Sequence, residues 1–312
     1  MRKIGYVLTL IIFQLVGLIA CSSKEVEPLS LVHKKEPVVT VTTSFLNDMV
    51  KQLAGSYVER ELIIPAGEDP HLYVARSSDL KKLQKADLVL YHGLHFEGKM
   101  VEALESKGVA VTKEFSKKDI GIMKENGREI VDPHFWFNID LYQKAVIVVS
   151  KELKKVAPEY KRAIAKNTKA YLSKLDKLNQ WNRQTLAKIP KNRRYLVTPH
   201  DAFNYFAKCY DFKIHAPQGV STDSEVANSD MMETVKLIND HRIKAIFTES
   251  TTNPERMKKL QEAVTAKGGK VAVITGEGNE LFSDSLAPDG HDGDTYIGMY
   301  QHNINLISKA LR

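Results

Sequence analysis

The sequence predicts an α/β fold of two similar lobes with parallel sheets, joined by one long helix, with a cleft between the lobes. Segments rich in β-branched residues alternate with segments of helical periodicity in the first part of the chain, and this alternation resumes near its end. Between them, residues 158–189 contain no glycine, and prolines stand only at the ends of this segment, Pro158 and Pro190. We expect an N-terminal lobe over residues 37–150, a linking helix within 151–191 and a C-terminal lobe over 192–312.

The N-terminus has the pattern of a bacterial lipoprotein signal. Arg2 and Lys3 precede an apolar run over residues 4–20 that is too short and too interrupted for a membrane span. The run ends in Leu18-Ile19-Ala20-Cys21, where cleavage before a lipid-modified cysteine is expected. We predict a signal peptide over residues 1–20, lipidation at Cys21 and a flexible tether over residues 21–36. An ordinary signal peptide with an incidental cysteine is the alternative.

In the N-terminal lobe, the β-branched run Val38–Thr42 predicts a strand. A helix should follow, because the apolar residues after Ser44 recur at helical spacing; Ser44 is placed to cap its start and Gly55 to end it. The other elements expected in this lobe are a strand over 58–64, a helix over 79–85 and a strand over 88–91.

The segment between the lobes carries an apolar stripe at near-helical spacing, which includes Ile164, Tyr171 and Leu175. It predicts a single helix of about 30 residues, much longer than the usual helix of a globular protein. In the C-terminal lobe we expect strands over 195–198, 213–216, 245–248 and 271–274, and helices over 201–210, 228–240, 254–267 and 296–311.

Composition narrows the classes of function. The formal net charge of +7 is dispersed over Lys-rich helical segments with acidic residues between them. No basic run with interleaved aromatic residues indicates nucleic-acid binding. Cys209 is the only cysteine besides Cys21, so lipidation of Cys21 leaves no intramolecular disulfide. A conventional apolar core must therefore hold the fold, and a mature chain of roughly 290 residues is long enough to form one.

Four positions form a candidate metal site, and all follow predicted strands or lead into helices. The tripeptide Asp-Pro-His occurs twice, ending at His71 and at His134. Proline fixes its own φ and holds the preceding residue extended, which stiffens the approach to each histidine. His200 follows a predicted strand directly, and Asp284 supplies a carboxylate. Ligands of open α/β sheets bind at the carboxyl ends of strands, so these side chains are expected to converge.

The other histidines carry weaker signals. His92 and His95 are three residues apart and form an alternative pair of ligands, although the glycine between them favours a strand-to-helix turn. The acidic run at 289–294 lacks the spacing of an EF-hand, so a polar turn is expected there. We interpret the remaining histidines as ordinary surface or core residues: His33, His215, His241 and His302.

With these motifs the chain resembles the metal-binding lipoproteins of bacterial manganese and zinc ABC importers, the cluster A-I solute-binding proteins. The resemblance covers Val38 to Leu311. It is carried by Asp69-Pro70-His71-Leu72-Tyr73, Ala86-Asp87-Leu88-Val89-Leu90-Tyr91, Gly93-Leu94-His95, Asp132-Pro133-His134-Phe135-Trp136-Phe137, His200-Asp201-Ala202-Phe203, Gln218-Gly219-Val220-Ser221-Thr222, Phe247-Thr248-Glu249-Ser250 and Leu281-Phe282-Ser283-Asp284.

The resemblance implies a site for one divalent metal in the interlobe cleft. His71 and His134 would come from the N-terminal lobe, and His200 and Asp284 from the C-terminal lobe. Glu249 matches a carboxylate that lies near the site, and we expect it to support the site without binding the metal. The implied partners are an ABC permease and its ATPase, and the membrane through the lipid anchor. We expect a monomer on the outer face of the bacterial cell membrane, or in the periplasm.

Two departures from the family pattern bear on the metal. The zinc-dedicated branch carries a histidine-rich loop between the first two ligands, whereas residues 112–131 contain no histidine. Some manganese-binding members have glutamate where His200 stands. The chain is most similar to the treponemal and bacillar receptors with three histidines and one aspartate. We therefore expect Mn²⁺ as the first choice and Zn²⁺ as the second.

Two other functions remain as alternatives. The first alternative is a zinc metallohydrolase that uses the same cleft. Three histidines and an aspartate can hold a catalytic zinc, with Glu249 as general base. The chain has no nucleophile elbow, HExxH motif or phosphate loop, which argues against an enzyme. The second alternative is a surface adhesin, as a secondary role. No sequence feature indicates a protein-binding patch.

Overall fold

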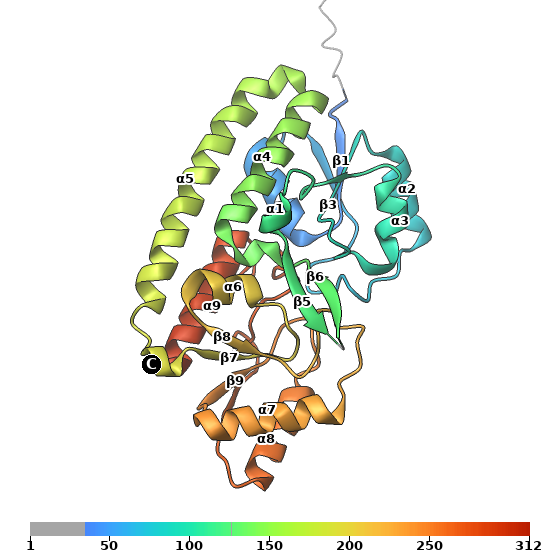
Figure 1. Ribbon diagram of the computed structural model, residues 1–312. Coiled ribbons are helices and arrows are strands. Elements are labelled where there is room, and N and C mark those ends of the chain that lie inside the picture. The colour runs from blue at the N-terminus through green and yellow to red at the C-terminus, as the bar shows by residue number, and fades with distance from the viewer. Residues whose placement is uncertain (1–34, 126) are drawn as a thin grey trace, which may run out of the picture. The chain divides into compact units, whose positions relative to one another are not determined.

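The structure is a computed structural model that describes residues 35–125 and 127–312. The predicted signal peptide, Cys21, His33 and most of the predicted tether lie outside the described residues. In the described part of the chain, no helix has the length and apolar character needed to span a bilayer. Residues 36–312 form one compact unit, and its α-helices and most of its strands are labelled in Figure 1.

The N-terminal lobe is built on a parallel sheet of four strands in the order β2-β1-β3-β4. All four residues of the central strand β1 are buried, as expected for an apolar strand that is covered on both faces. Helix α1 ends at Gly55, which adopts a positive φ of 55°. The elements of this lobe are β1 (Val38–Val41), α1 (Ser44–Ala54), β2 (Glu59–Leu62), α2 (Ser77–Lys85), β3 (Leu88–Tyr91), η1 (Gly98–Met100), α3 (Val101–Glu105), β4 (Val109–Ala110) and η2 (Lys117–Asp119).

Ser44 does not cap α1, so that prediction is wrong. Thr43 occupies the N-cap position and makes no side-chain capping bond. The Ser44 hydroxyl instead accepts a hydrogen bond from the backbone N–H of Leu286 (2.9 Å) and lies 3.1 Å from the hydroxyl of Ser285. Four residues further along α1, the Asp48 carboxylate accepts a hydrogen bond from the N–H of Tyr296 (3.0 Å). Helix α1 is thus tied to the last part of the chain.

An antiparallel hairpin interrupts the otherwise parallel architecture. Strand β5 (Gly121–Glu125) pairs with β6 (Arg128–Asp132) in the register Gly121 to Asp132. The alternation of strands and helices does not predict this hairpin. It matters for the site because β6 ends at Asp132, the first residue of the second Asp-Pro-His tripeptide.

The predicted long helix is present as α5 (Lys161–Leu186), which has 26 residues. At 1.5 Å per residue it is about 39 Å long. A short 3₁₀ turn, η4 (Pro158–Tyr160), leads into it, and α4 (Ile139–Val156) precedes that turn. The buried stripe of α5 includes Ile164, Tyr171 and Leu175, as the spacing predicts. Helix α5 contacts α1, α4 and α9 and extends along one side of residues 36–312 (Figure 1).

The C-terminal lobe contains two parallel strand pairs, β7 with β8 and β9 with β10, and β7 also lies beside β9. Helices α7 and α8 pack together over these strands through a separate apolar cluster. The elements of the lobe are η5 (Lys191–Arg193), β7 (Tyr195–Val197), α6 (Asn204–Tyr210), β8 (Lys213–His215), α7 (Asn228–His241), β9 (Ala245–Phe247), α8 (Glu255–Ala266), β10 (Ala272–Ile274) and α9 (Tyr296–Leu311).

Both lobes share one aromatic core. The rings of Tyr142 on α4 and Tyr296 on α9 stack with their centroids 3.6 Å apart. The short 3₁₀ turn η3 (Phe135–Phe137) follows His134, and its Trp136 donates from Nε1 to the carbonyl of Ser283 (2.9 Å). The hydroxyl of Tyr296 donates to the carbonyl of Trp136 (2.6 Å). These contacts fix the segment after His134 against the segment that carries Asp284.

Candidate metal centre

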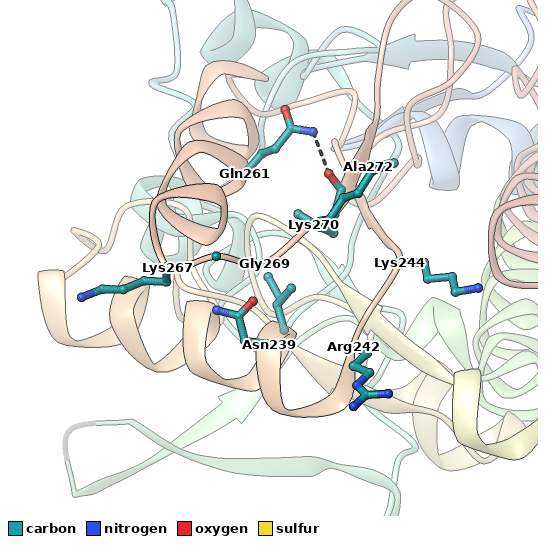
Figure 2. A pocket seen from close by; sticks show the side chains of 11 residues that line it. Asn239, Arg242, Lys244, Gln261, Lys267, Gly269, Lys270 and Ala272 are labelled. Carbon is teal, nitrogen blue, oxygen red and sulfur yellow. Dashed lines mark hydrogen bonds between the residues drawn. The ribbon is translucent and has the colours of Figure 1, made fainter.

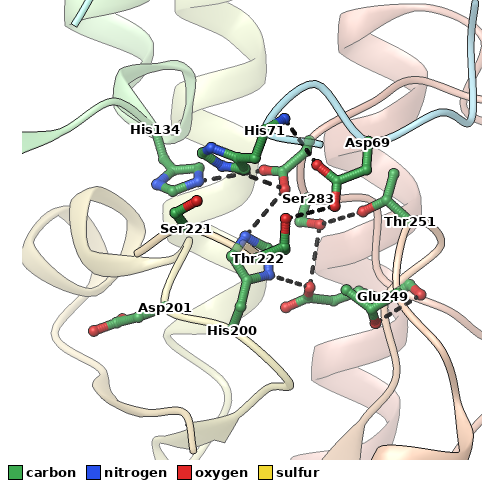
Figure 3. Close-up of polar contacts among 12 residues, drawn as sticks. Asp69, His71, His134, His200, Asp201, Ser221, Thr222, Glu249, Thr251 and Ser283 are labelled. Carbon is green, nitrogen blue, oxygen red and sulfur yellow. Dashed lines mark hydrogen bonds and ion pairs between the residues drawn. The ribbon is translucent and has the colours of Figure 1, made fainter. Parts of the chain in front are cut away.

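The four predicted ligands come together in the structure. One possible ligand atom from each of His71, His134, His200 and Asp284 lies within 4.8 Å of all the others. Asp284 is at the centre of the group: its Oδ1 lies 3.3 Å from His134 Nε2. Its Oδ2 lies 3.0 Å from His200 Nε2 and 3.8 Å from His71 Nε2. Figure 3 shows the three histidines pointing toward one another.

Each predicted ligand lies in a segment that follows a strand. His71 lies in the loop after β2, His134 follows β6, and His200 follows β7. Asp284 lies in the segment between β10 and α9. Isolated parallel bridges extend the C-terminal strand pairs at their carboxyl ends, joining His200 to Gln218 and Glu249 to Leu281. The predicted convergence at strand ends is therefore what the fold produces.

The repeated tripeptide forms the same local turn twice. In the first copy, the backbone N–H of His71 donates to Oδ1 of Asp69 (2.9 Å). In the second, the N–H of His134 donates to Oδ1 of Asp132 (3.0 Å). A carboxylate that bonds the backbone two residues later is a common turn motif, and the intervening proline restricts the turn further. Both histidines are thereby held before any ligand binds.

Two histidines are oriented by carboxylates on their far sides. Nδ1 of His134 lies 2.8 Å from Oδ1 of Asp132, and Nδ1 of His200 lies 2.5 Å from Oε2 of Glu249. With Nδ1 donating to a carboxylate, Nε2 of each ring faces the centre. Metal-binding histidines are held in this way, because the carboxylate fixes the tautomer and the ring orientation.

The centre contains five buried polar atoms without a hydrogen-bond partner. They are Nε2 of the three histidines and both carboxylate oxygens of Asp284. Nearly all buried polar atoms of folded proteins are hydrogen-bonded, so five unpaired atoms that face one point require an explanation. A cation bound among them would satisfy all five. Three imidazole nitrogens with one carboxylate suit Zn²⁺ and are compatible with Mn²⁺.

A match to the family described as zinc-uptake complex component A, periplasmic, extends over residues 39–310. The chain belongs to this family.

Individual relatives agree with this assignment. The manganese-binding lipoprotein MntA of Bacillus subtilis is 40% identical over 278 residues, which are 88% of this chain and 89% of MntA. The solved structure of the periplasmic zinc-binding protein TroA from Treponema pallidum is 37% identical and has a TM-score of 0.83, covering 88% of this chain and 99% of TroA. Another solved TroA structure is 71% identical, with a TM-score of 0.88, and covers 89% of this chain and 100% of that one.

Charge is balanced within the centre of this family member. Burial alone would raise the pKa of Asp284, but His200 and His134 prevail and hold it well below the usual range. Burial opposes the charged form of His134 as well, yet the carboxylates of Asp132 and Asp284 beside its ring raise its pKa to about 9. His71 has no carboxylate on its far side, and burial lowers its pKa to about 3. It therefore presents a neutral imidazole.

The sequence does not identify several residues that support the site. Asp132 stands out only as part of the tripeptide, and the motif does not predict its contact with Nδ1 of His134. Asp69 also accepts a hydrogen bond from the hydroxyl of Thr222 (2.6 Å), which ties the His71 loop to the C-terminal lobe. Phe96 packs edge-on against the His71 ring, with centroids 5.1 Å apart.

His92 and His95 do not form a second pair of ligands. Nε2 of the buried His92 bonds the hydroxyl of Thr43 (2.7 Å), whereas His95 is exposed on the other side of a tight turn. Three other described histidines, outside the acidic run, have ordinary partners, in keeping with their interpretation. His215 bonds the Thr234 hydroxyl, His241 the Tyr195 hydroxyl and His302 the Glu280 carbonyl. The run at 289–294 forms a mostly exposed turn, as predicted.

A cavity of about 910 Å³ lies at the ends of α7 and α8, away from the histidines of the candidate site. Its lining includes Arg242, Lys244, Lys267 and Lys270 but no histidine or carboxylate (Figure 2). Cations near the last turns of helices offset the partial negative charge of the terminal carbonyl groups. This cavity is therefore unsuited to a metal cation, and two of its basic residues, Arg242 and Lys267, are the C-caps of α7 and α8.

The turn beside His71 is held by a buried carboxylate, Glu97. It accepts hydrogen bonds from the N–H of His92 (2.6 Å) and from the hydroxyl of Thr42 (2.8 Å). The N–H of Gly93 lies 3.4 Å from its other oxygen. Burial outweighs these bonds and raises the pKa of Glu97 from 4.5 to about 7.

This shift predicts how the stability of the metal-free protein depends on pH. Between pH 4.5 and 7 the folded chain keeps the Glu97 proton that the unfolded chain has lost. The free energy of unfolding therefore falls as pH rises through this window, by at most about 3 kcal/mol from this group. Glu97→Gln, which cannot titrate, should lose this contribution. Urea unfolding from pH 4.5 to 8 in the presence of a chelator measures the difference.

The control for this experiment is Glu225→Gln, an exposed position in the C-terminal lobe. The variant with glutamine at position 97 loses hydrogen bonds at every pH, so the slope and not the absolute stability is the quantity compared. Parallel pH profiles for wild type and Glu97→Gln would show that the Glu97 carboxyl titrates alike in the folded and unfolded chains.

Proposed function

We propose that this protein is an extracytoplasmic receptor that binds one divalent transition metal with high affinity and delivers it to an ABC-type permease with its ATPase. The observation that carries the proposal is the convergence of five buried, unpaired ligand atoms from His71, His134, His200 and Asp284. The metal is the transported cargo. The assignment of these four residues as ligands, with Glu249 as the residue that orients His200, is part of the proposal.

Mn²⁺ is our first choice of metal and Zn²⁺ the second. Both are consistent with the relatives, because MntA is named for manganese and the Treponema pallidum TroA for zinc. The histidine-free segment at 112–131 favours manganese, since it forms η2 and the β5–β6 hairpin in place of a histidine-rich loop.

Burial favours a receptor over a hydrolase. His134, His200 and Asp284 are 0% exposed, and the four side chains together supply a complete tetrahedral set. A catalytic zinc keeps an open position for water or substrate, which needs space beside the ion. Glu249 is also engaged with Nδ1 of His200, on the side away from the other ligands. It is therefore poorly placed to act as a general base.

We further propose the domain organisation and the anchoring that the sequence predicts. The lobes would span 37–150 and 192–312, with 151–191 as the linker; α4 crosses the first boundary. Lipidation at Cys21 would hold the protein at the outer face of the membrane, on a tether ending at residue 36. Relatives such as MntA are named lipoproteins, which supports this anchoring. We expect a monomer without affinity for nucleic acid.

Complementation of a bacterial strain that lacks the protein tests the function. Wild type should restore growth and metal accumulation in medium depleted of manganese and zinc. His134→Ala should not, because it removes a ligand. Cys21→Ser should leave a protein that binds metal but is released from the membrane, with impaired uptake. Normal metal accumulation in the strain that carries His134→Ala would contradict the proposed function, and membrane retention of Cys21→Ser would contradict the anchor alone.

A further inference from the structure

A cavity of about 330 Å³ connects the candidate metal centre to the surface. Among the four proposed ligands only His71 lines it. His71 is also the only one of the four with measurable exposure, 6% against 0% for the others. The cavity is lined by His71, Leu94, His95, Gly98, Lys99, Ile130, Val131, Pro133, Val220, Ser221, Asp223 and Ser224. We call it the access cavity.

One wall of the access cavity has strained backbone. Leu94 and His95 are consecutive non-glycine residues with positive φ, 57° and 63°. Such residues cost conformational energy and persist only where the surrounding structure imposes them, often at ligand sites. Here Glu97 imposes the turn through its bonds to the N–H groups at its start. Gly98, at its end, is so close to His71 that an added Cβ would lie 2.6 Å from the His71 carbonyl oxygen.

The strained turn places an imidazole on the wall of the access cavity. His95 is exposed, and among the described residues its side chain has no hydrogen-bond or ion-pair partner. A second metal-binding group, the exposed carboxylate of Asp223, lines the cavity from the C-terminal lobe and is similarly without a partner in the described chain. Lys99 also lines the cavity, and the negative charge of Asp223 offsets its repulsion of a cation.

We propose that the metal ion enters and leaves through the access cavity and that His95, with Asp223, is a transient ligand that receives the hydrated ion and passes it to His71. This inference rests on the proposed function. An ion that moves from water to a site of four protein ligands must lose its hydration shell. A ligand at the opening replaces the first waters and divides the exchange into smaller steps. Because His95 lies on the path and outside the final site, it acts on the rates of binding and release.

Thermodynamics gives this role a distinctive signature. A group that stabilises only the path lowers the barrier equally in both directions, so its removal slows association and dissociation by the same factor. The dissociation constant stays unchanged. Removal of a ligand of the final site acts differently, since it weakens binding mainly through faster dissociation.

The test is stopped-flow measurement of Zn²⁺ binding and of its release to excess chelator. Trp136, whose ring lies 5.2 Å from that of His134, serves as the fluorescent reporter. His95→Asn suits the test because asparagine tolerates a positive φ. We expect both rate constants to fall by about fivefold or more while the dissociation constant changes by less than about twofold. Asp223→Asn should act in the same direction. His291→Asn, at an exposed turn outside the cavity, is the matched control.

Each outcome decides between the proposals. Unchanged rates in His95→Asn would overturn the inference, and so would weaker equilibrium binding with unchanged association, because either would place His95 off the path. A wild-type protein that binds neither Zn²⁺ nor Mn²⁺ at equilibrium would instead defeat the proposed function. That outcome is recognised before any rate is compared.

Discussion

His134→Ala is expected to weaken Zn²⁺ binding by at least tenfold. Loss of a residue that only supports a metal ligand costs about 10- to 100-fold in affinity, and loss of a direct ligand should cost no less. His134 is fully buried, so no water-filled space exists beside it to supply a replacement without rearrangement. The variant also leaves the Asp132 carboxylate, 1% exposed, without its imidazole partner. Titration against a chelator of known affinity measures the effect.

The matched control is His302→Ala. His302 bonds a backbone carbonyl and packs on Phe282, outside the centre, so its loss should leave the affinity for Zn²⁺ unchanged. Melting curves of both variants in excess chelator show whether the metal-free fold is retained. Alanine at His71, His200 or Asp284 is expected to act in the same direction as alanine at His134. Full affinity in His134→Ala would exclude His134 as a ligand.

Zn²⁺ is expected to bind in vitro at least as tightly as Mn²⁺, even if manganese is the transported ion. Three imidazoles and one carboxylate form a nitrogen-rich set that suits zinc, whereas manganese prefers oxygen ligands. The intrinsic affinity order of divalent metals also places manganese lowest. Both ions should raise the melting temperature, because a ligand that binds only the folded state stabilises it, by about 4 kcal/mol at 1,000 times the dissociation constant.

Competition at neutral pH with buffered free metal tests this order. Zn²⁺ should displace Mn²⁺ at equal free concentration and give the larger rise in melting temperature. If Mn²⁺ displaced Zn²⁺, the ligand set could not be three histidines and one aspartate. If Zn²⁺ binds more tightly, as expected, selectivity for manganese in the cell has to come from metal availability or from release at the permease, and not from equilibrium affinity.

The sequence predicted most of the architecture because its signals were local. The long helix follows from an apolar stripe without glycine or internal proline, and the site follows from histidines placed after strands. The β5–β6 hairpin was missed although Asn126-Gly127 is a strong hairpin signal, because the flanking strands are rich in charged residues. The position of Ser44 before a helix suggested a cap, and only the tertiary contact with Leu286 shows its actual role.

The residues that support the site are harder to predict from the sequence, because their roles depend on tertiary contacts. Asp132 is next to the proline of its tripeptide, so its backbone turn is local, but its contact with Nδ1 depends on the rotamer of His134. Thr222 reaches Asp69 across 153 positions of the chain. No periodicity or spacing encodes such a contact, which exists only once both lobes are in place.

The contacts that tie α1 to the C-terminal segment have a consequence for the order of folding. Ser44 meets Leu286, and Asp48 meets Tyr296 at the start of the last helix, 242 and 248 positions away. Such contacts give the chain a high contact order, and the core of the first lobe is complete only when the last residues have docked. A chain threaded unfolded through a membrane would thus carry its histidines as separate, weak ligands until translocation ends. If the protein is exported as we propose, its binding site would form outside the membrane, where the cargo is collected.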